Sequence, residues 1–195
     1  MIIGITGGTG SGKTTFLKVV EEIGGLALDC DAIYHELLKT DKVLLDAIEA
    51  RFPGVVMDGT LDRKALGNLV FSDEAALQDL NKITHGAVKK EVLRRLENAP
   101  SLVAIDAIGL FESGLNELCD TTVAIVAPMK KQIERVCQRD GVTFAYAKKR
   151  VFAQKQPKTY ASLCQHQLRN NTTEEAFREK CLAFLRREII MKEKP

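Results

Sequence analysis

The stretch GGTGSGKTT, residues 7–15, constrains the fold of this chain more than any other feature. It contains a glycine, four variable residues and then Gly12-Lys13-Thr14. The short apolar run IIGIT (2–6) precedes it, and a helical pattern follows it. Glycines let the backbone curl so that successive N–H groups face an anion, and a helix N-terminus adds partial positive charge. A strand, this loop and a helix together predict a phosphate-binding P-loop.

The P-loop assigns chemistry to individual residues. The lysine, Lys13, is predicted to reach the β- and γ-phosphates, and the Thr14 hydroxyl is predicted to bind magnesium. The dinucleotide fingerprint G-x-G-x-x-G fits less well, because the last glycine has the wrong spacing. The predicted ATP-binding residues of the loop are Gly8, Thr9, Gly10, Ser11, Gly12, Lys13, Thr14 and Thr15.

Apolar runs and helical periodicity alternate along the chain. Four runs are typical of buried parallel strands, at 2–6, 26–29, 101–106 and 121–127, and a polar run at 164–171 is a weaker fifth candidate. Strands that alternate with helices predict an α/β fold with a parallel sheet. Residues 32–98 are too helical and too long for a simple crossover, so we interpret them as an inserted substrate region. The pattern Thr172-x-x-Glu175 predicts a capping box at the last helix.

The composition is that of an ordinary globular protein. The chain has 195 residues, of which 45% are hydrophobic, and no apolar run approaches the roughly 20 residues that span a bilayer. The apolar N-terminus lacks the basic flank of a signal peptide. The five cysteines are scattered and form no C-x-x-C pair, which favours reduced thiols in a cytoplasmic protein.

Positive charge is concentrated in one segment. Residues 130–158 contain nine lysines and arginines against two acidic residues, although the net charge of the chain is only +2. Such a segment can bind nucleic acid, a membrane surface or a phosphorylated small molecule, or can simply be a solvated helix face.

Two carboxylates follow the second predicted strand in the sequence LDCDAI, which contains Asp29 and Asp31. Residues two apart in a strand point to the same face, so an extended backbone would place both carboxylates together. They could hold a metal, accept a proton or cap the following helix.

A P-loop predicts nucleotide binding and leaves the reaction open, because GTPases, motor ATPases and small-molecule kinases all use it. The chain has no N-K-x-D pattern of a GTPase. Its basic segment follows the fourth strand, where nucleotide kinases carry an arginine-rich lid. These two features favour a kinase.

Six motifs in order along the chain resemble one family. They are IIGITGGTGSGKTT, LDCDAIYHEL, DGTLDRKALGNLVFSD, ITHGAV, IDAIGLFESG, and QIERVCQRD followed by AKKRVFAQ. The last pair carries the patterns Q-x-x-R-x-x-x-R and R-x-x-x-Q. The sequence thereby resembles the dephospho-coenzyme A kinases over nearly its whole length.

The resemblance implies a three-layer P-loop fold with a five-stranded parallel sheet, a helical coenzyme A region and a lid. It implies transfer of the γ-phosphoryl group of ATP to the ribose 3′-hydroxyl of dephospho-coenzyme A, the last step of coenzyme A synthesis. The expected divisions are a nucleotide-binding core at 1–31, 99–129 and 159–195, a coenzyme A region at 32–98 and a basic lid at 130–158.

The resemblance also implies roles for single residues. Asp31 matches the catalytic base, with a helix N-cap as the alternative. Asp29 could help to hold magnesium through water, fix the position of Asp31 or be structural. Arg139 is expected to stabilise the transferring group. The other implied contacts are Arg135 and Asn170 for ATP, Arg63, His85 and Arg150 for the substrate, and Thr14 and Asp106 for Mg²⁺. Glu112 is expected to be structural or to orient the substrate.

The sequence departs from the family pattern at several positions. Gly86 replaces a proline after His85, and Ile108 and Gly109 replace a proline and a leucine. The family's A-D-x-V-I-x-N becomes CQHQLRN here, although Asn170 keeps the asparagine position near the adenine.

Three alternative functions are also considered. They are another P-loop kinase of a nucleoside, nucleotide or sugar, a regulatory nucleotide-binding protein without turnover, and a nucleic-acid binder. Aromatic residues make up only 6% of the chain, and no nucleic-acid-binding module is recognisable. We therefore expect a cytoplasmic, monomeric enzyme that binds ATP and dephospho-coenzyme A and neither nucleic acid nor a membrane.

Overall fold

The structure, a computed structural model, describes residues 1–193. The chain divides into two compact units. Unit 1 consists of Met1–Leu28 and the chain from Ala99 onward, and unit 2 is Asp29–Asn98. Unit 1 contains the segment 130–158 that the sequence predicts to be a lid.

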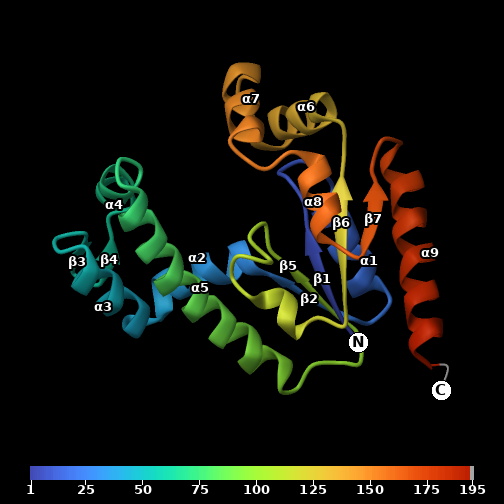
Figure 1. The fold of residues 1–195 in the computed structure, drawn as a ribbon, viewed down its shortest axis with the longest axis horizontal. Helices are drawn as coiled ribbons and strands as arrows, with labels where there is room; N and C mark the ends of the chain where they lie inside the picture. The colour runs from blue at the N-terminus through green and yellow to red at the C-terminus, as the bar shows by residue number, and fades with distance from the viewer. Residues whose placement is uncertain (194–195) are drawn as a thin grey trace. The chain divides into compact units, whose positions relative to one another are not determined.

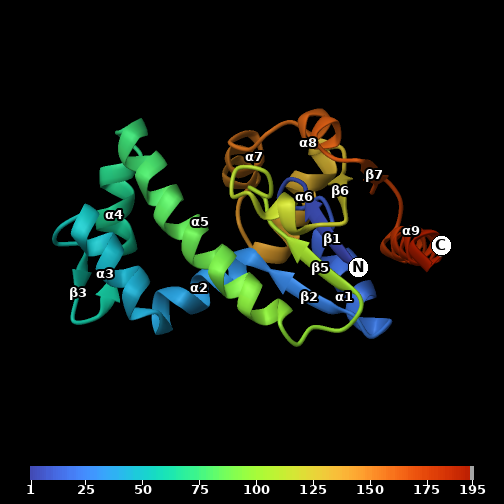
Figure 2. The same ribbon diagram turned by 60° about the horizontal axis from the view of Figure 1, so that its bottom comes forward.

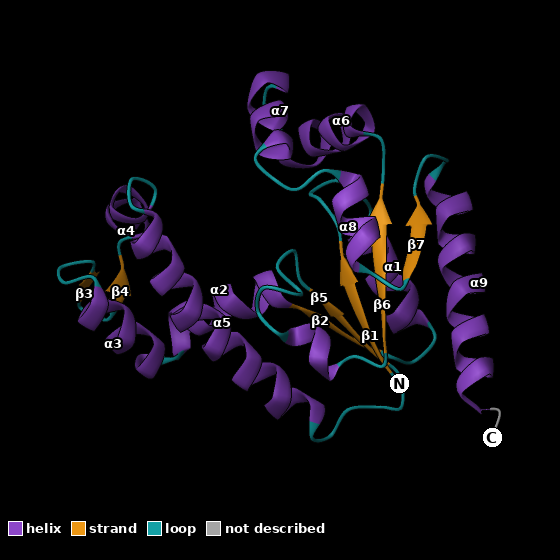
Figure 3. Cartoon of the chain, viewed as in Figure 1, coloured by secondary structure: helices purple, strands orange, loops and turns teal. Residues whose placement is uncertain are grey.

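Unit 1 is built on a five-stranded sheet, whose strands are drawn as orange arrows in Figure 3. The strand order is β2-β5-β1-β6-β7. The strands are β1 (Ile2–Thr6), β2 (Leu26–Asp29), β5 (Val103–Asp106), β6 (Thr121–Val126) and β7 (His166–Arg169). The pairings of β1 with β5, of β1 with β6 and of β6 with β7 are parallel. The predicted parallel sheet is therefore confirmed, and the weak polar candidate forms its edge strand β7.

Helices cover both faces of this sheet (Figure 1). The helices on the faces are α1 (Lys13–Glu22), α8 (Pro157–Leu163) and α9 (Glu174–Glu193), and the chain also forms the 3₁₀ helix η1 (Leu115–Leu118). Helices α6 (Met129–Asp140) and α7 (Phe144–Phe152) pack against each other beyond the ends of the strands (Figure 1). Val123 and Ile125 of β6 lie in one core with Phe16 of α1 and Phe177 of α9. Ala124 and Val126 point to the opposite face and pack against Tyr160 of α8. The alternation produces three layers, as predicted.

Unit 2 is mainly helical, and Figure 2 shows α5 running beside α2, α3 and α4. Its elements are α2 (Cys30–Thr40), α3 (Lys42–Arg51), β3 (Val56–Met57), β4 (Thr60–Leu61), α4 (Arg63–Val70) and α5 (Glu74–Leu96). The buried side chains of Leu44, Ile48, Val88 and Val92 belong to the apolar stripes seen in the sequence. The turn at 58–59 joins β3 and β4, which form a small antiparallel ladder.

Two local predictions were wrong. Strand β2 ends at Asp29 and α2 begins at Cys30, so the two-residue periodicity does not extend to Asp31. At the last helix, the Thr173 hydroxyl accepts a hydrogen bond from the Ala176 N–H, so the cap is Thr173 and not Thr172. The helix cap lies two residues before the end of the extended pattern in the first case, and one residue after the predicted position in the second.

Within residues 1–193, the structure contains no helix that is long and apolar enough to cross a membrane.

Candidate active site

The P-loop connects β1 to α1 at the carboxyl edge of the sheet of unit 1. Its first turn is closed by a hydrogen bond from the Ser11 N–H to the Gly8 carbonyl at 3.2 Å. Within residues 1–193, the backbone N–H groups of Gly12, Lys13 and Thr14 have no hydrogen-bond acceptor. Free N–H groups at the start of a helix form an anion-binding site. The loop therefore has the donors that a phosphate requires.

Lys13 lies beside these amides. Its Nζ donates to the Gly7 carbonyl at 2.9 Å and is 4.0 Å from Asp106 Oδ1. The Asp106 carboxylate ends β5 next to β1 and is buried. The sheet thus brings the lysine cation and an acidic side chain to one edge of unit 1. The phosphate contact predicted for Lys13 and the magnesium contact predicted for Asp106 stay predictions.

The donor set for a metal consists of few side chains. Residues 1–193 contain no group of three or more His, Cys, Asp and Glu side chains that could hold a metal ion. The exposed Thr14 hydroxyl in the first turn of α1 and the Asp106 carboxylate are oxygen ligands, which suit Mg²⁺. Such a set fits a magnesium ion that takes its remaining ligands from phosphates and water.

Arg135 and Asn170 bind the outer side of the loop, and the two residues together are called its brace. The Asn170 Nδ2 donates to the Ser11 carbonyl at 2.8 Å, and Arg135 donates to Asn170 Oδ1 at 2.9 Å and to the Gly10 carbonyl at 3.2 Å. Burial lowers the pKa of Arg135 from its usual range. Since both side chains bind loop carbonyls, they turn the carbonyls outward and leave the N–H groups free for an anion.

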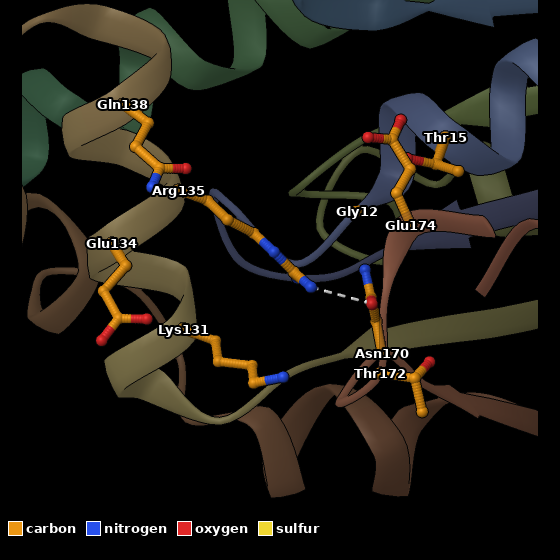
Figure 4. A pocket seen from close by; sticks show the side chains of 9 residues that line it. All are labelled: Gly12, Thr15, Lys131, Glu134, Arg135, Gln138, Asn170, Thr172 and Glu174. Carbon is orange, nitrogen blue, oxygen red and sulfur yellow. Dashed lines mark hydrogen bonds between the residues drawn. The ribbon is translucent and has the colours of Figure 1, made fainter. Parts of the chain in front are cut away.

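A cavity of about 400 Å³ opens beside this brace (Figure 4). Its lining comes from the P-loop, α6 and the connection from β7 to α9, and consists of Gly12, Thr15, Lys131, Glu134, Arg135, Gln138, Asn170, Thr172 and Glu174. Figure 4 shows the guanidinium of Arg135 pointing toward the Asn170 amide, and the Glu174 side chain extending away from Asn170 on the side of Thr15. The planar guanidinium and the surrounding donors and acceptors can bind a flat polar ring.

Two glutamines, which sequence reasoning missed, also contact the loop. Gln132 Nε2 donates to the Ala127 carbonyl at 2.8 Å, and the backbone of Gln132 packs against Gly10. The Thr9 N–H donates to Gln154 Oε1 at 2.7 Å. Both glutamines belong to the patterns Q-x-x-R and R-x-x-x-Q, which were the available signal.

The remaining lid arginines contact an acidic neighbour. Arg139 binds Asp140 through Nε at 2.6 Å, and Arg150 binds the same carboxylate through Nη1 at 2.7 Å. These contacts hold the pKa of Asp140 at about 2, chiefly through the hydrogen bond from Arg139. Arg139 and Arg150 are therefore brought together as a pair, whereas Arg135, one turn before Arg139, binds the P-loop. Glu112 forms an ion pair with Lys155.

The two aspartates of LDCDAI occupy different positions at the start of α2 in unit 2. Asp29 caps α2, because its Oδ1 accepts from the N–H groups of Asp31 at 2.9 Å and Ala32 at 3.1 Å. Asp31 lies in the first turn with an exposed side chain, so the N-cap role considered for it belongs to Asp29. The Asp31 carboxylate is accordingly not used as the cap.

The other predicted substrate residues also lie in unit 2. Arg63 begins α4, is exposed and lies near the half-buried Tyr34. His85 lies in the middle of α5, where burial lowers its pKa and favours the neutral imidazole at pH 7. Gly86 stands where the family has a proline, and α5 continues through it without a break.

Comparison with known proteins gives a consistent result. The family model described as CoaE, dephospho-CoA kinase, matches residues 1–175. A dephospho-CoA kinase from Moorella thermoacetica is 36% identical over 160 residues, covering 78% of this chain and 76% of the relative. One from Geobacter sulfurreducens is 33% identical over 181 residues, covering 89% and 91%. The crystal structure of TT1252 from Thermus thermophilus superimposes with a TM-score of 0.83 and 31% identity, covering 96% of this chain and 97% of that one.

Proposed function

This chain belongs to the dephospho-CoA kinase family, and from that premise we propose how its residues transfer the γ-phosphoryl group of ATP to the ribose 3′-hydroxyl of dephospho-coenzyme A. The family catalyses the final step of coenzyme A biosynthesis, and this chain is an ATP-dependent kinase. The observation that carries the proposal is the P-loop with its free N–H groups, its lysine and its outer brace.

The nucleotide is bound entirely by unit 1. The loop N–H groups and Lys13 bind the phosphate chain, and the cavity beside Arg135 receives the adenine. Asn170 lies between loop and cavity, since its Nδ2 donates to the Ser11 carbonyl and its Oδ1 accepts from Arg135. The adenine contacts are therefore supported here by Asn170, although the family's alanine and aspartate are replaced by Cys164 and Gln165.

The acceptor hydroxyl is oriented by Asp31. The Asp29 cap fixes the start of α2, which leaves the exposed Asp31 carboxylate available to accept a hydrogen bond from the 3′-hydroxyl. As the phosphoryl group is transferred, Asp31 takes the hydroxyl proton. Arg63 and His85 contribute to binding dephospho-coenzyme A.

Negative charge on the transferring group is stabilised by Lys13 and the lid. Arg139 and Arg150, which Asp140 holds side by side, supply a second group of positive charge. Mg²⁺, which kinases of this type generally use, would be held by Thr14 and Asp106 and would neutralise charge on the phosphates.

A coupled assay tests this function. Protein, ATP, magnesium and dephospho-coenzyme A should yield ADP and coenzyme A in equal amounts, and the position of the new phosphate can be read by NMR. The Lys13→Ala variant is the control and should lose most of the turnover. Phosphorylation of adenosine or a monophosphate in its place would indicate another kinase, and ATP binding without any acceptor would indicate a regulatory protein.

A further inference from the structure

Gln154 approaches the P-loop from the segment that joins α7 to α8. Its Oε1 accepts the Thr9 N–H at 2.7 Å, across 145 residues of sequence. A Cβ atom on Gly8 would lie 3.4 Å from the same oxygen and 2.8 Å from Gln132 Oε1. The carboxamide of Gln154 therefore rests on the Gly8–Thr9 peptide, and the absence of a side chain at Gly8 makes room for the Gln132 carboxamide beside it.

This contact determines how the carboxamide is oriented. A backbone N–H can only donate, so the atom of Gln154 that faces Thr9 is the oxygen. The Nε2 group is then turned away from Thr9, and it has no acceptor within residues 1–193. The half-buried residue Gln154 thus holds an amide donor without a partner among the described residues against the same loop that carries the free N–H groups of Gly12, Lys13 and Thr14.

The surrounding contacts fix the chain at Gln154. The next residue, Lys155, forms an ion pair with Glu112. Gln156, two residues after Gln154, offers a contrast, because its side chain is exposed and forms no cap hydrogen bond at the start of α8. Gln154 and Gln156 are therefore identical side chains with different surroundings, one on the P-loop and one in solvent.

We propose that Gln154 is a further residue of the phosphate site, in which Oε1 holds the Thr9 N–H while Nε2 donates to a terminal phosphate oxygen of ATP. The proposal rests on the ATP site described above. A neutral carboxamide can serve both partners at once, because it carries an acceptor and two donors. Through this residue the end of the lid contacts the nucleotide phosphates directly.

Replacement by glutamate separates this role from a merely structural one. The Gln154→Glu variant keeps the length and the acceptor for Thr9, but it loses the donor and adds a negative charge. If Gln154 only supports the loop, the glutamate should serve as well as the glutamine. If Gln154 faces the phosphates, the glutamate repels them and should bind ATP more weakly than the alanine variant does.

The experiment measures dissociation constants for ATP and ADP by calorimetry in wild type, Gln154→Ala, Gln154→Glu and the control Gln156→Glu. We expect ATP affinity to fall about tenfold in Gln154→Ala, the loss of one hydrogen bond to a charged group. In Gln154→Glu it should fall on the order of 100-fold, with ADP less affected than ATP. Gln156→Glu should match the wild type.

Two results would overturn the proposal. One is ATP binding by Gln154→Glu at wild-type strength, and the other is an equal loss for ATP and ADP in both variants. If Gln154→Glu fails to fold, the test rests on Gln154→Ala. A larger loss of affinity for ATP than for ADP in that variant supports the proposal, and equal losses overturn it. A wild-type protein that shows no transfer to dephospho-coenzyme A would refute the proposed function, whereas wild-type turnover with unaffected Gln154 variants would refute only this role.

Discussion

Asp29 and Asp31 lie two residues apart, and the start of α2 gives them different roles. Asp29 accepts two backbone N–H bonds as the N-cap, and Asp31 has an exposed carboxylate in the first turn. A side chain used as a cap is fixed by the helix, whereas the one after it stays available for a ligand. The roles can therefore be separated by mutation.

Asp29→Ala should lower the free energy of unfolding by about 1 kcal/mol, the usual value of an N-cap. Asp31→Asn should leave that free energy nearly unchanged and reduce kcat by about 10²–10³-fold, as expected for a general base. Urea titration and steady-state kinetics measure the two effects. Near-normal kcat in Asp31→Asn would remove the base from the mechanism.

Gly12 and Gly24 provide a matched pair of glycines. Their φ angles are +109° and +85°, a region in which a side chain costs roughly 1–2 kcal/mol. A methyl group on Gly12 would in addition overlap the Asn170 amide, whereas Gly24 has open space around it. Both substitutions should therefore destabilise the protein, but only one should distort the P-loop.

We expect Gly12→Ala to weaken ATP binding by on the order of 100-fold and Gly24→Ala to leave it within about twofold. Calorimetry with ATP measures both, and thermal unfolding shows that each variant is folded. Equal ATP affinities in the two variants would mean that the Gly12–Asn170 contact has no role in forming the loop.

Helix α6 distributes its positive charge over two neighbouring sites. Arg135 binds the P-loop carbonyls and Asn170, and Arg139, four residues later, binds Asp140. Residues four apart lie on one helical face, so a single helix reaches the nucleotide loop and the Arg150 pair together. The basic segment is thus an organised part of unit 1, which a charge count alone could not distinguish from a solvated helix.

Helix α5 contains a carboxylate with a strongly altered pKa. Hydrogen bonds from Arg94 and Arg95 hold the pKa of Glu91 at about 2, below its ordinary value of 4.5. A depressed folded pKa stabilises the fold above the unfolded pKa, and this contribution is lost as the pH falls toward the folded pKa. Glu91 should therefore stabilise unit 2 above about pH 5 and lose this effect between about pH 4.5 and pH 2.

Glu91→Gln should lower the free energy of unfolding at pH 7 by about 1 kcal/mol, and the difference from wild type should shrink at pH 3. Urea unfolding at the two pH values measures this. A difference that stays constant between pH 7 and pH 3 would show that the two arginines do not stabilise the charged form of Glu91.

At the scale of the whole molecule, the two compact units correspond to two proposed binding functions. The P-loop, its brace and the adenine cavity belong to unit 1, and Asp31, Arg63 and His85 belong to unit 2. Ligands that bind only the folded state slow the local opening of the region they contact. Each substrate should therefore protect a different set of amides.

Hydrogen exchange followed by mass spectrometry measures this protection. ATP at about 100 times its dissociation constant should slow exchange up to ~100-fold in the P-loop, α6 and the connection from β7 to α9. Dephospho-coenzyme A should add protection in α2 and α4. Protection of unit 2 by ATP alone, with unit 1 unaffected, would contradict the assignment of the nucleotide to unit 1.

The sequence alone predicted what depends on local pattern. A strand, a glycine-rich loop and a lysine define the P-loop within residues 2–13, and apolar runs predicted four of the five strands of the sheet, because both features require only neighbouring residues. The fifth strand, β7, came from a weaker polar run. The second strand was predicted to end at Asp29, as it does, but the helix caps were misplaced: Asp29 caps α2 in place of Asp31, and Thr173 caps α9 in place of Thr172. A cap depends on the exact backbone angles where a helix begins.

Only the tertiary structure decided which side chains surround the loop. The contacts of Asn170 with Ser11, Gln154 with Thr9 and Arg135 with Gly10 span 159, 145 and 125 residues. Such contacts form because the sheet order places β1 and β6 side by side and brings the segments that follow them to one edge. No local pattern contains that information, because it arises from how distant elements pack.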